Sequence, residues 1–150
     1  MALSNSDLHE LYTAYHTDNF KRFETACVAM FVEFWVSQIP PDIKDQLLDA
    51  IRNSRTRKDM WVRFRPVIRP DNEIEIGGRR MSSFHIVHKT DALAQIAAAI
   101  GPQIRVRAVP SAVREGSLVL RIEYWPPVGH IIHNPEDTYA DLPPLEGHDF

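Results

Sequence analysis

Apolar side chains recur at every third or fourth position in the first part of the chain, and this spacing predicts amphipathic helices. The pattern begins after Ser4 and Asp7, a pair with the spacing of a helical capping box. The apolar residues that follow at helical intervals are Leu8, Leu11, Tyr12 and Tyr15. We expect this first helix to end near His16, and Asp18 to cap the next helix.

The second expected helix, residues 20–39, is apolar around most of its circumference and is followed by Pro40 and Pro41. A helix with so little polar surface is buried on several sides, either by its own domain or by another subunit. We therefore expect a homo-oligomer, most simply a dimer, because sizeable apolar surfaces mark interfaces and symmetric pairing is the commonest assembly. The side chains expected to form that contact are Val28, Phe31, Val32 and Trp35.

A third helix is expected over residues 42–52, after which the apolar spacing changes to every second position. That period is typical of half-buried strands. The expected strands are residues 60–65, 73–76, 79–88, 103–108 and 118–125. Gly77 and Gly78 have the form of a two-residue hairpin turn. Between the third and fourth of these strands, Thr90 is expected to cap a short helix that ends at Gly101.

This order of elements indicates an α+β protein. We expect a single domain over residues 1–125, in which an N-terminal three-helix segment packs on an antiparallel or mixed sheet of four to five strands. Pro66 favours an edge position for the first strand, since proline has no N–H to donate to a neighbour. Residues 126–150 contain five of the chain's 11 prolines and show no apolar period. We expect them to form an extended, acidic, proline-rich tail.

Charge is distributed unevenly along the chain, although the formal net charge is only −3. Residues 1–51 carry 3 basic against 8 acidic side chains, residues 52–121 carry 14 against 6, and residues 122–150 carry none against 6. A basic middle between acidic ends fits an external anionic partner. It fits equally a folded unit in which the ends, the tail included, neutralise the middle.

The arginines of this basic region fall mainly on one face of the expected sheet. Alternation places them, with two tryptophans, on the side away from the core: Trp61, Arg63, Arg65, Arg105, Arg107, Arg121 and Trp125. A hairpin centred near Val113 sets Arg105 opposite Arg121, a like-charge pair that an anion lying across the face would relieve. Arginine matches phosphates and carboxylates, and indole rings can stack on unpaired bases. Polar residues are nevertheless expected on any solvent-facing sheet, and Glu123 lies on this same face.

No motif for catalysis or for phosphate binding is found along the chain. Cys27, the single cysteine, is expected to be a buried structural thiol, because its neighbours on the helix are aromatic. His85 and His88 are expected on opposite faces of a strand, where they cannot share an ion. His130 and His133 precede two acids but lack the spacing of a structural zinc site. The sequence thus gives no positive indication of an enzyme, and no cofactor or metal is expected.

The chain begins without a basic, apolar leader, and its longest apolar stretch is far shorter than the roughly 20 residues of a membrane span, so we expect a cytoplasmic protein. The favoured function is non-catalytic binding, in which the basic, tryptophan-bearing sheet face engages single-stranded nucleic acid such as RNA, or an acidic protein segment. The alternative is an oligomeric structural or adaptor protein that self-associates through residues 20–39 and docks through the tail. A hydrolase using His130 and His133 is a remoter third possibility.

Overall fold

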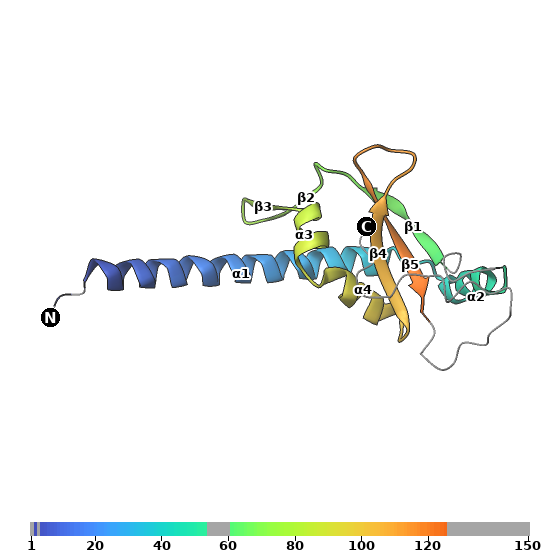
Figure 1. Cartoon of the computed structure of the whole chain (residues 1–150), viewed down its shortest axis with the longest axis horizontal. Coiled ribbons are helices and arrows are strands. Elements are labelled where there is room, and N and C mark those ends of the chain that lie inside the picture. The colour runs from blue at the N-terminus through green and yellow to red at the C-terminus, as the bar shows by residue number, and fades with distance from the viewer. Residues whose placement is uncertain (1, 3, 54–60, 126–150) are drawn as a thin grey trace, which may run out of the picture.

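The computed structural model describes residue 2, residues 4–53 and residues 61–125, and it confirms the α+β class. Four helices and five strands lie within these residues (Figure 1). The helices are α1 (Asn5–Ser37), α2 (Ile43–Asn53), α3 (Ser83–Lys89) and α4 (Ala92–Ile100). The strands are β1 (Trp61–Ile68), β2 (Glu73–Ile76), β3 (Arg79–Ser82), β4 (Ile104–Pro110) and β5 (Leu118–Tyr124). The expected tail over residues 126–150 lies outside the described residues.

One continuous helix of 33 residues, α1, replaces the two helices expected before residue 40. Its start is as predicted: the Asp7 N–H donates to Ser4 Oγ at 3.1 Å, and the Ser4 N–H donates to the Asp7 carboxylate at 3.3 Å. The expected break near His16 is wrong, because no glycine or proline interrupts residues 5–37. Asp18 does not cap a second helix; it pairs with Arg22 at 3.1 Å, one turn further along the same helix.

The five strands divide into two groups instead of forming one sheet of four to five strands. β1, β5 and β4 form an antiparallel sheet in that order, whereas β2 and β3 form a separate hairpin. β1 is at an edge among the described strands, as Pro66 predicts. In the separate hairpin Ile76 pairs with Arg79, so Gly77 and Gly78 alone make the turn, at φ of +58° and +81°. Positive φ at both positions is what this turn requires, and the predicted hairpin is confirmed.

The segment after β3 is a helix, although alternation predicted a strand as far as His88. β3 ends at Ser82, whose hydroxyl accepts a hydrogen bond from the Phe84 N–H at 3.1 Å and caps α3. β2 offers only four residues to pair with β3, so the chain has no strand partner beyond Ser82. His85 and His88 are therefore three residues apart on a helix, not on opposite faces of a strand. Side chains three residues apart on a helix lie on the same face, so these two histidines are not kept apart as the strand prediction required.

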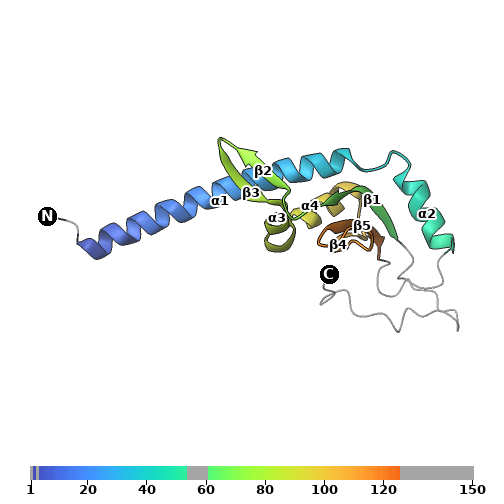
Figure 2. The same cartoon turned by 90° about the horizontal axis from the view of Figure 1, so that it is seen from above.

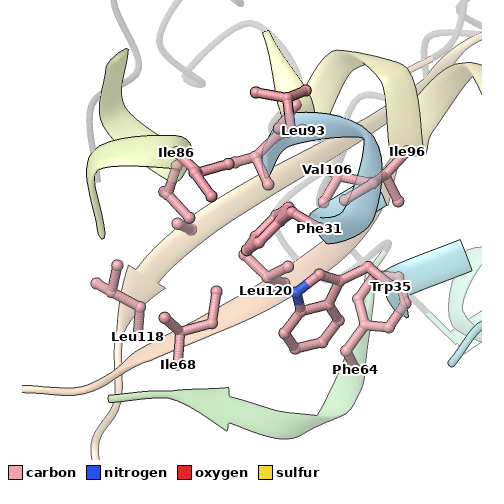
Figure 3. Close-up of a cluster of buried hydrophobic side chains, with 14 of the residues drawn as sticks. Phe31, Trp35, Phe64, Ile68, Ile86, Leu93, Ile96, Val106, Leu118 and Leu120 are labelled. Carbon is pink, nitrogen blue, oxygen red and sulfur yellow. The ribbon is translucent and has the colours of Figure 1, made fainter. Parts of the chain in front are cut away.

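The core lies between α1, α4 and one face of the three-stranded sheet (Figure 3). Trp35 of α1 meets Phe64 of β1 edge to face, with ring centroids 5.1 Å apart, and Phe31 lies one turn away. Ile96 of α4 and Leu120 of β5 complete the fully buried centre. The inner face of the sheet thus belongs to the core, and the arginines lie on the other side.

Three of the four residues predicted to form a subunit interface belong to this core. Val28, Phe31 and Trp35 are buried by their own chain, and Val32 packs half-buried against them. Their apolar surface is already covered within one molecule, so they are not a free face of the helix. Self-association of the chain stays a prediction, and it would have to use a surface other than these four side chains.

Candidate anion-binding face of the sheet

The outer face of the three-stranded sheet is organised in rows that cross from β1 through β5 to β4. In the first row Trp61 pairs with Glu123 and Glu123 with Arg105. In the second row Arg63 pairs with Arg121, and the partner of Arg121 on β4 is Arg107. Five of the seven predicted site residues are brought together in this way. We call the seven residues and Glu123 the arginine face.

The remaining two predicted residues lie at the margins of the arginine face. Arg65 falls in an irregularity of β1 between Arg63 and Val67, where the strand has residues without a partner on β5, and its side chain is exposed. Trp125 follows β5, and its backbone N–H donates to the Gln103 carbonyl at 2.8 Å. This bond extends the pairing of the last two strands by one residue.

The register of the hairpin differs from the predicted one. Arg105 faces Glu123, and Arg107 faces Arg121, so the hairpin is centred one residue later than Val113. A bond between the Ser111 N–H and the Ser117 carbonyl, 2.9 Å, closes the loop in this register. Moving the centre by one residue shifts every pair by two, which leaves each side chain on its predicted face. The faces were therefore predictable, whereas the partners were not.

Glu123 is the centre of a buried cluster that the sequence did not reveal. Its carboxylate lies 3.4 Å from Arg107 Nη1 and 3.9 Å from Arg121 Nη1, and it accepts the Trp125 indole N–H at 3.2 Å. Arg107, Glu123 and Trp125 are each only 8% exposed. The pairing of a carboxylate with two guanidinium groups is what allows charges to be buried here.

Both tryptophans of the arginine face are engaged within the protein. The Arg121 guanidinium lies over the Trp61 ring, 4.2 Å from its centroid, in a cation–π contact. The Trp125 ring is buried and its N–H is bonded to Glu123. The buried Trp125 ring and the covered face of Trp61 reduce the indole surface on which an unpaired base could stack.

Three arginines remain open to solvent around this cluster. Arg63 and Arg65 of β1 and Arg105 of β4 are exposed, and within the described part of the chain no acidic side chain forms an ion pair with them. Arg105 has Glu123 as its neighbour across the strands, but that carboxylate is directed to Arg107 and Arg121. The arginine face therefore carries five guanidinium groups against one carboxylate, with the three outer ones free to meet an anion.

A second polar contact, also missed by sequence reasoning, joins α3 to α1. His85 Nε2 lies 2.7 Å from the Glu24 carboxylate, although the two residues are 61 positions apart in the chain. Glu24 also borders a pocket of about 260 Å³ lined by Thr25, Thr90 and Asp91 among others. No cysteine or serine lines this pocket, and among the described residues no group of three His, Cys, Asp or Glu side chains has metal-binding geometry. His130 and His133 lie outside those residues.

Cys27 is fully buried in the core, as the sequence predicted. Burial raises the pKa of the Cys27 thiol, and the nearby Arg79 guanidinium opposes this only in part. Since the thiolate is the reactive form, we expect a thiol reagent such as DTNB at pH 8 to label the folded protein at least about tenfold more slowly than the unfolded one. Protein unfolded in urea is the reference and should yield one thiol per chain. Equal rates in the two states would show that Cys27 is accessible.

Comparison with known proteins gives no match: no family model, curated protein or solved structure resembles the chain significantly. None of the described helices combines the length and the apolar character required to cross a membrane. The function must therefore be argued from the arginine face itself.

Proposed function

We propose that the protein is a non-catalytic binding module whose arginine face engages an acidic segment of another polypeptide. The observation that carries this proposal is the combination of three exposed guanidinium groups, Arg63, Arg65 and Arg105, with two indole rings that are already engaged. Guanidinium groups bind carboxylates through charge-assisted hydrogen bonds, which need no aromatic platform. Single-stranded nucleic acid depends in addition on stacking of its bases, and this contribution is weakened here.

The spacing of the exposed arginines suits an extended peptide. β1 and β4 flank β5, so Arg63 and Arg105 are two strand spacings apart, about 10 Å, and are offset by one row of the sheet. An extended chain advances about 3.3 Å per residue, so carboxylates four positions apart, on the same side of the peptide, span about 13 Å. An acidic residue at every second position would therefore reach both outer strands.

The expected affinity is modest. Exposed ion pairs contribute roughly 0.2–1 kcal/mol each and are screened by salt. Three such pairs, with the partly exposed Arg121 behind them, contribute at most about 4 kcal/mol, so a dissociation constant of about 1 mM or weaker is expected at low ionic strength.

The test is fluorescence anisotropy with a labelled twelve-residue peptide of alternating Glu and Ser, titrated with the full chain at low salt. Replacement of Arg63, Arg65 and Arg105 by Ser together should weaken binding by about threefold to a hundredfold, since each lost contact costs a few tenths to one kcal/mol. The fold should be retained, because all three side chains are exposed.

The matched control removes three positive charges elsewhere, by Arg52→Ser, Arg80→Ser and Lys89→Ser on α2, β3 and α3. This variant has the same net charge and should bind almost as well as the parent. Equal loss in the two triple variants would assign the binding to overall charge and overturn the proposal. Stronger binding of a single-stranded RNA of equal charge would favour the nucleic-acid hypothesis instead.

A further inference from the structure

The N-terminal part of α1 makes no packing contact with the rest of the described protein. Figures 1 and 2 show this helix extending well beyond the other elements, and every side chain from Ser4 to Asp18 is exposed. Four of these side chains are large and apolar, with exposures of 50–65%: Leu8, Leu11, Tyr12 and Tyr15. A helix of this length is marginally stable alone in water, and its apolar side chains indicate an interface.

The exposed apolar residues continue along the same side of the helix over its C-terminal half. At about 100° per residue, one arc of about 100° holds six exposed apolar side chains: Leu8, Tyr12, Tyr15, Ala26, Met30 and Phe34. The same arc also holds the polar residues Asn5, His16, Asn19 and Glu33 and the partly buried Phe23. The centre of the arc lies about 125° around the helix from the centre of the side formed by Cys27, Val28, Phe31 and Trp35, which face the core. We call the six exposed apolar residues the outer stripe of α1.

We propose that the outer stripe pairs with the outer stripe of a second copy of this chain, with the two α1 helices antiparallel. In this arrangement Leu8 of one copy faces Phe34 of the other, Tyr12 faces Met30, and Tyr15 faces Ala26. The large tyrosine thus meets the small alanine, as interdigitating helices require. The seam from residue 8 to residue 34 is about 39 Å long, at 1.5 Å per residue.

Charge complementarity selects the antiparallel direction. Asp18 and Arg22 stand at one edge of the stripe, on either side of its midpoint, and bond to each other within one helix at 3.1 Å. Antiparallel pairing brings Asp18 of each copy beside Arg22 of the other, so four charges alternate in sign around the symmetry axis. A symmetric parallel pair would instead place the Asp18 and Arg22 side chains of the two copies at opposite edges of the seam, where the charges of one copy would gain nothing from those of the other.

The available area is near the lower limit of a stable interface. Five large apolar side chains of the outer stripe are each about half exposed: Leu8, Tyr12, Tyr15, Met30 and Phe34. Burying roughly 100 Å² on each gives about 1,000 Å² over both copies, which is the size of a small, weak interface. A reversible dimer in the micromolar range is the expected result. This pairing is independent of peptide binding by the arginine face.

Sedimentation equilibrium on the full chain between 1 and 500 μM tests the surface. The parent should convert from monomer to dimer within this range, and Tyr12→Glu should weaken association at least about tenfold by burying a charge in the seam. The control Thr13→Glu adds the same charge to the same exposed turn, but about 100° around the helix from Tyr12 and outside the outer stripe. It should dimerise like the parent. A parent that remains monomeric, or a Tyr12→Glu variant that dimerises normally, overturns the proposal.

Engineered cysteines test the direction. Tyr12→Cys combined with Met30→Cys should form a disulfide-linked dimer on mild oxidation, whereas Tyr12→Cys alone should not. The two cysteines cannot bond within one chain, because 18 residues of helix separate them by about 27 Å and a disulfide needs less than about 7 Å. The native Cys27 is buried and serves as the background in both variants. Linkage of the single Tyr12→Cys variant would establish a parallel pair and exclude the antiparallel arrangement.

Discussion

Trp35→Ala is expected to destabilise the folded protein by about 3–5 kcal/mol, the loss typical of a large aromatic side chain removed from a core. Trp35 is 3% exposed and joins α1 to the sheet through Phe64, with Phe31 and Phe34 also against its ring. Its removal leaves a cavity where the helix and β1 meet, and neither element can move without disturbing the other contacts. A loss of this size is a large share of the 5–15 kcal/mol of a typical domain.

Urea unfolding followed by far-ultraviolet circular dichroism measures this loss, and thermal unfolding should show a Tm lower by roughly 10 °C. Glu33→Ala is the control, since Glu33 is exposed two positions away on the same helix and its removal should change the free energy of unfolding by less than about 0.5 kcal/mol. A Trp35→Ala variant within 1 kcal/mol of the parent would contradict the packing described for the core.

Glu123→Gln is the second substitution from which a large effect is expected. It preserves the shape of the side chain but removes the charge that compensates Arg107 and Arg121, at 3.4 and 3.9 Å. Breaking a buried ion pair on one side costs about 3–5 kcal/mol, because a buried charge loses its partner. The same substitution makes the arginine face more positive, so the folded fraction should bind the acidic peptide more tightly. Stability and affinity are thus expected to change in opposite directions.

Glu115→Gln provides the control for this experiment, because it is the same chemical change at an exposed position of the loop between β4 and β5. It should leave the urea midpoint unchanged. The double variant Arg107→Met/Glu123→Gln should recover part of the lost stability, since it removes a buried charge together with its partner. If Glu123→Gln alone were as stable as the parent, the buried cluster would not depend on charge.

Sequence patterns predicted those features that are decided locally. The capping box at Ser4 and Asp7, the turn at Gly77 and Gly78 and the alternation of inward and outward residues on β4 and β5 are all present. Each depends on residues close together in the chain, or on the alternation of inward and outward side chains along a strand. That alternation is unchanged when the pairing with the neighbouring strand shifts by two residues. The α+β class follows from the same signals.

The errors arose where a local signal has two physical outcomes. Asp18 can cap a helix or form an ion pair one turn away, and in an uninterrupted run without glycine or proline the ion pair prevailed. Residues 83–88 alternate like a strand, but a strand needs a partner and β2 ends too early to provide one. An apolar helix face is the same in sequence whether its own core or a second molecule covers it, which explains why Val28, Phe31 and Trp35 were assigned to an interface.

The site was predicted as a set of residues but not as an arrangement. Alternation identified the arginines and tryptophans of the outer face, whereas the role of Glu123 depends on the register between strands joined by a loop. Only that register shows that Arg107, Arg121 and both indoles make internal contacts, whereas Arg63, Arg65 and Arg105 are exposed. The proposal of a carboxylate ligand in place of nucleic-acid bases rests on this arrangement, not on composition.

The most direct test of the central claim compares the affinities of the parent protein for the acidic peptide and for a single-stranded RNA of equal charge, measured by anisotropy over 20–300 mM salt. We expect saturable binding of the peptide that weakens as salt increases, with the RNA bound no more tightly, since Trp125 is buried and Arg121 covers one face of the Trp61 ring. Absence of peptide binding at 20 mM salt, or RNA binding tenfold tighter than peptide binding, would contradict the account.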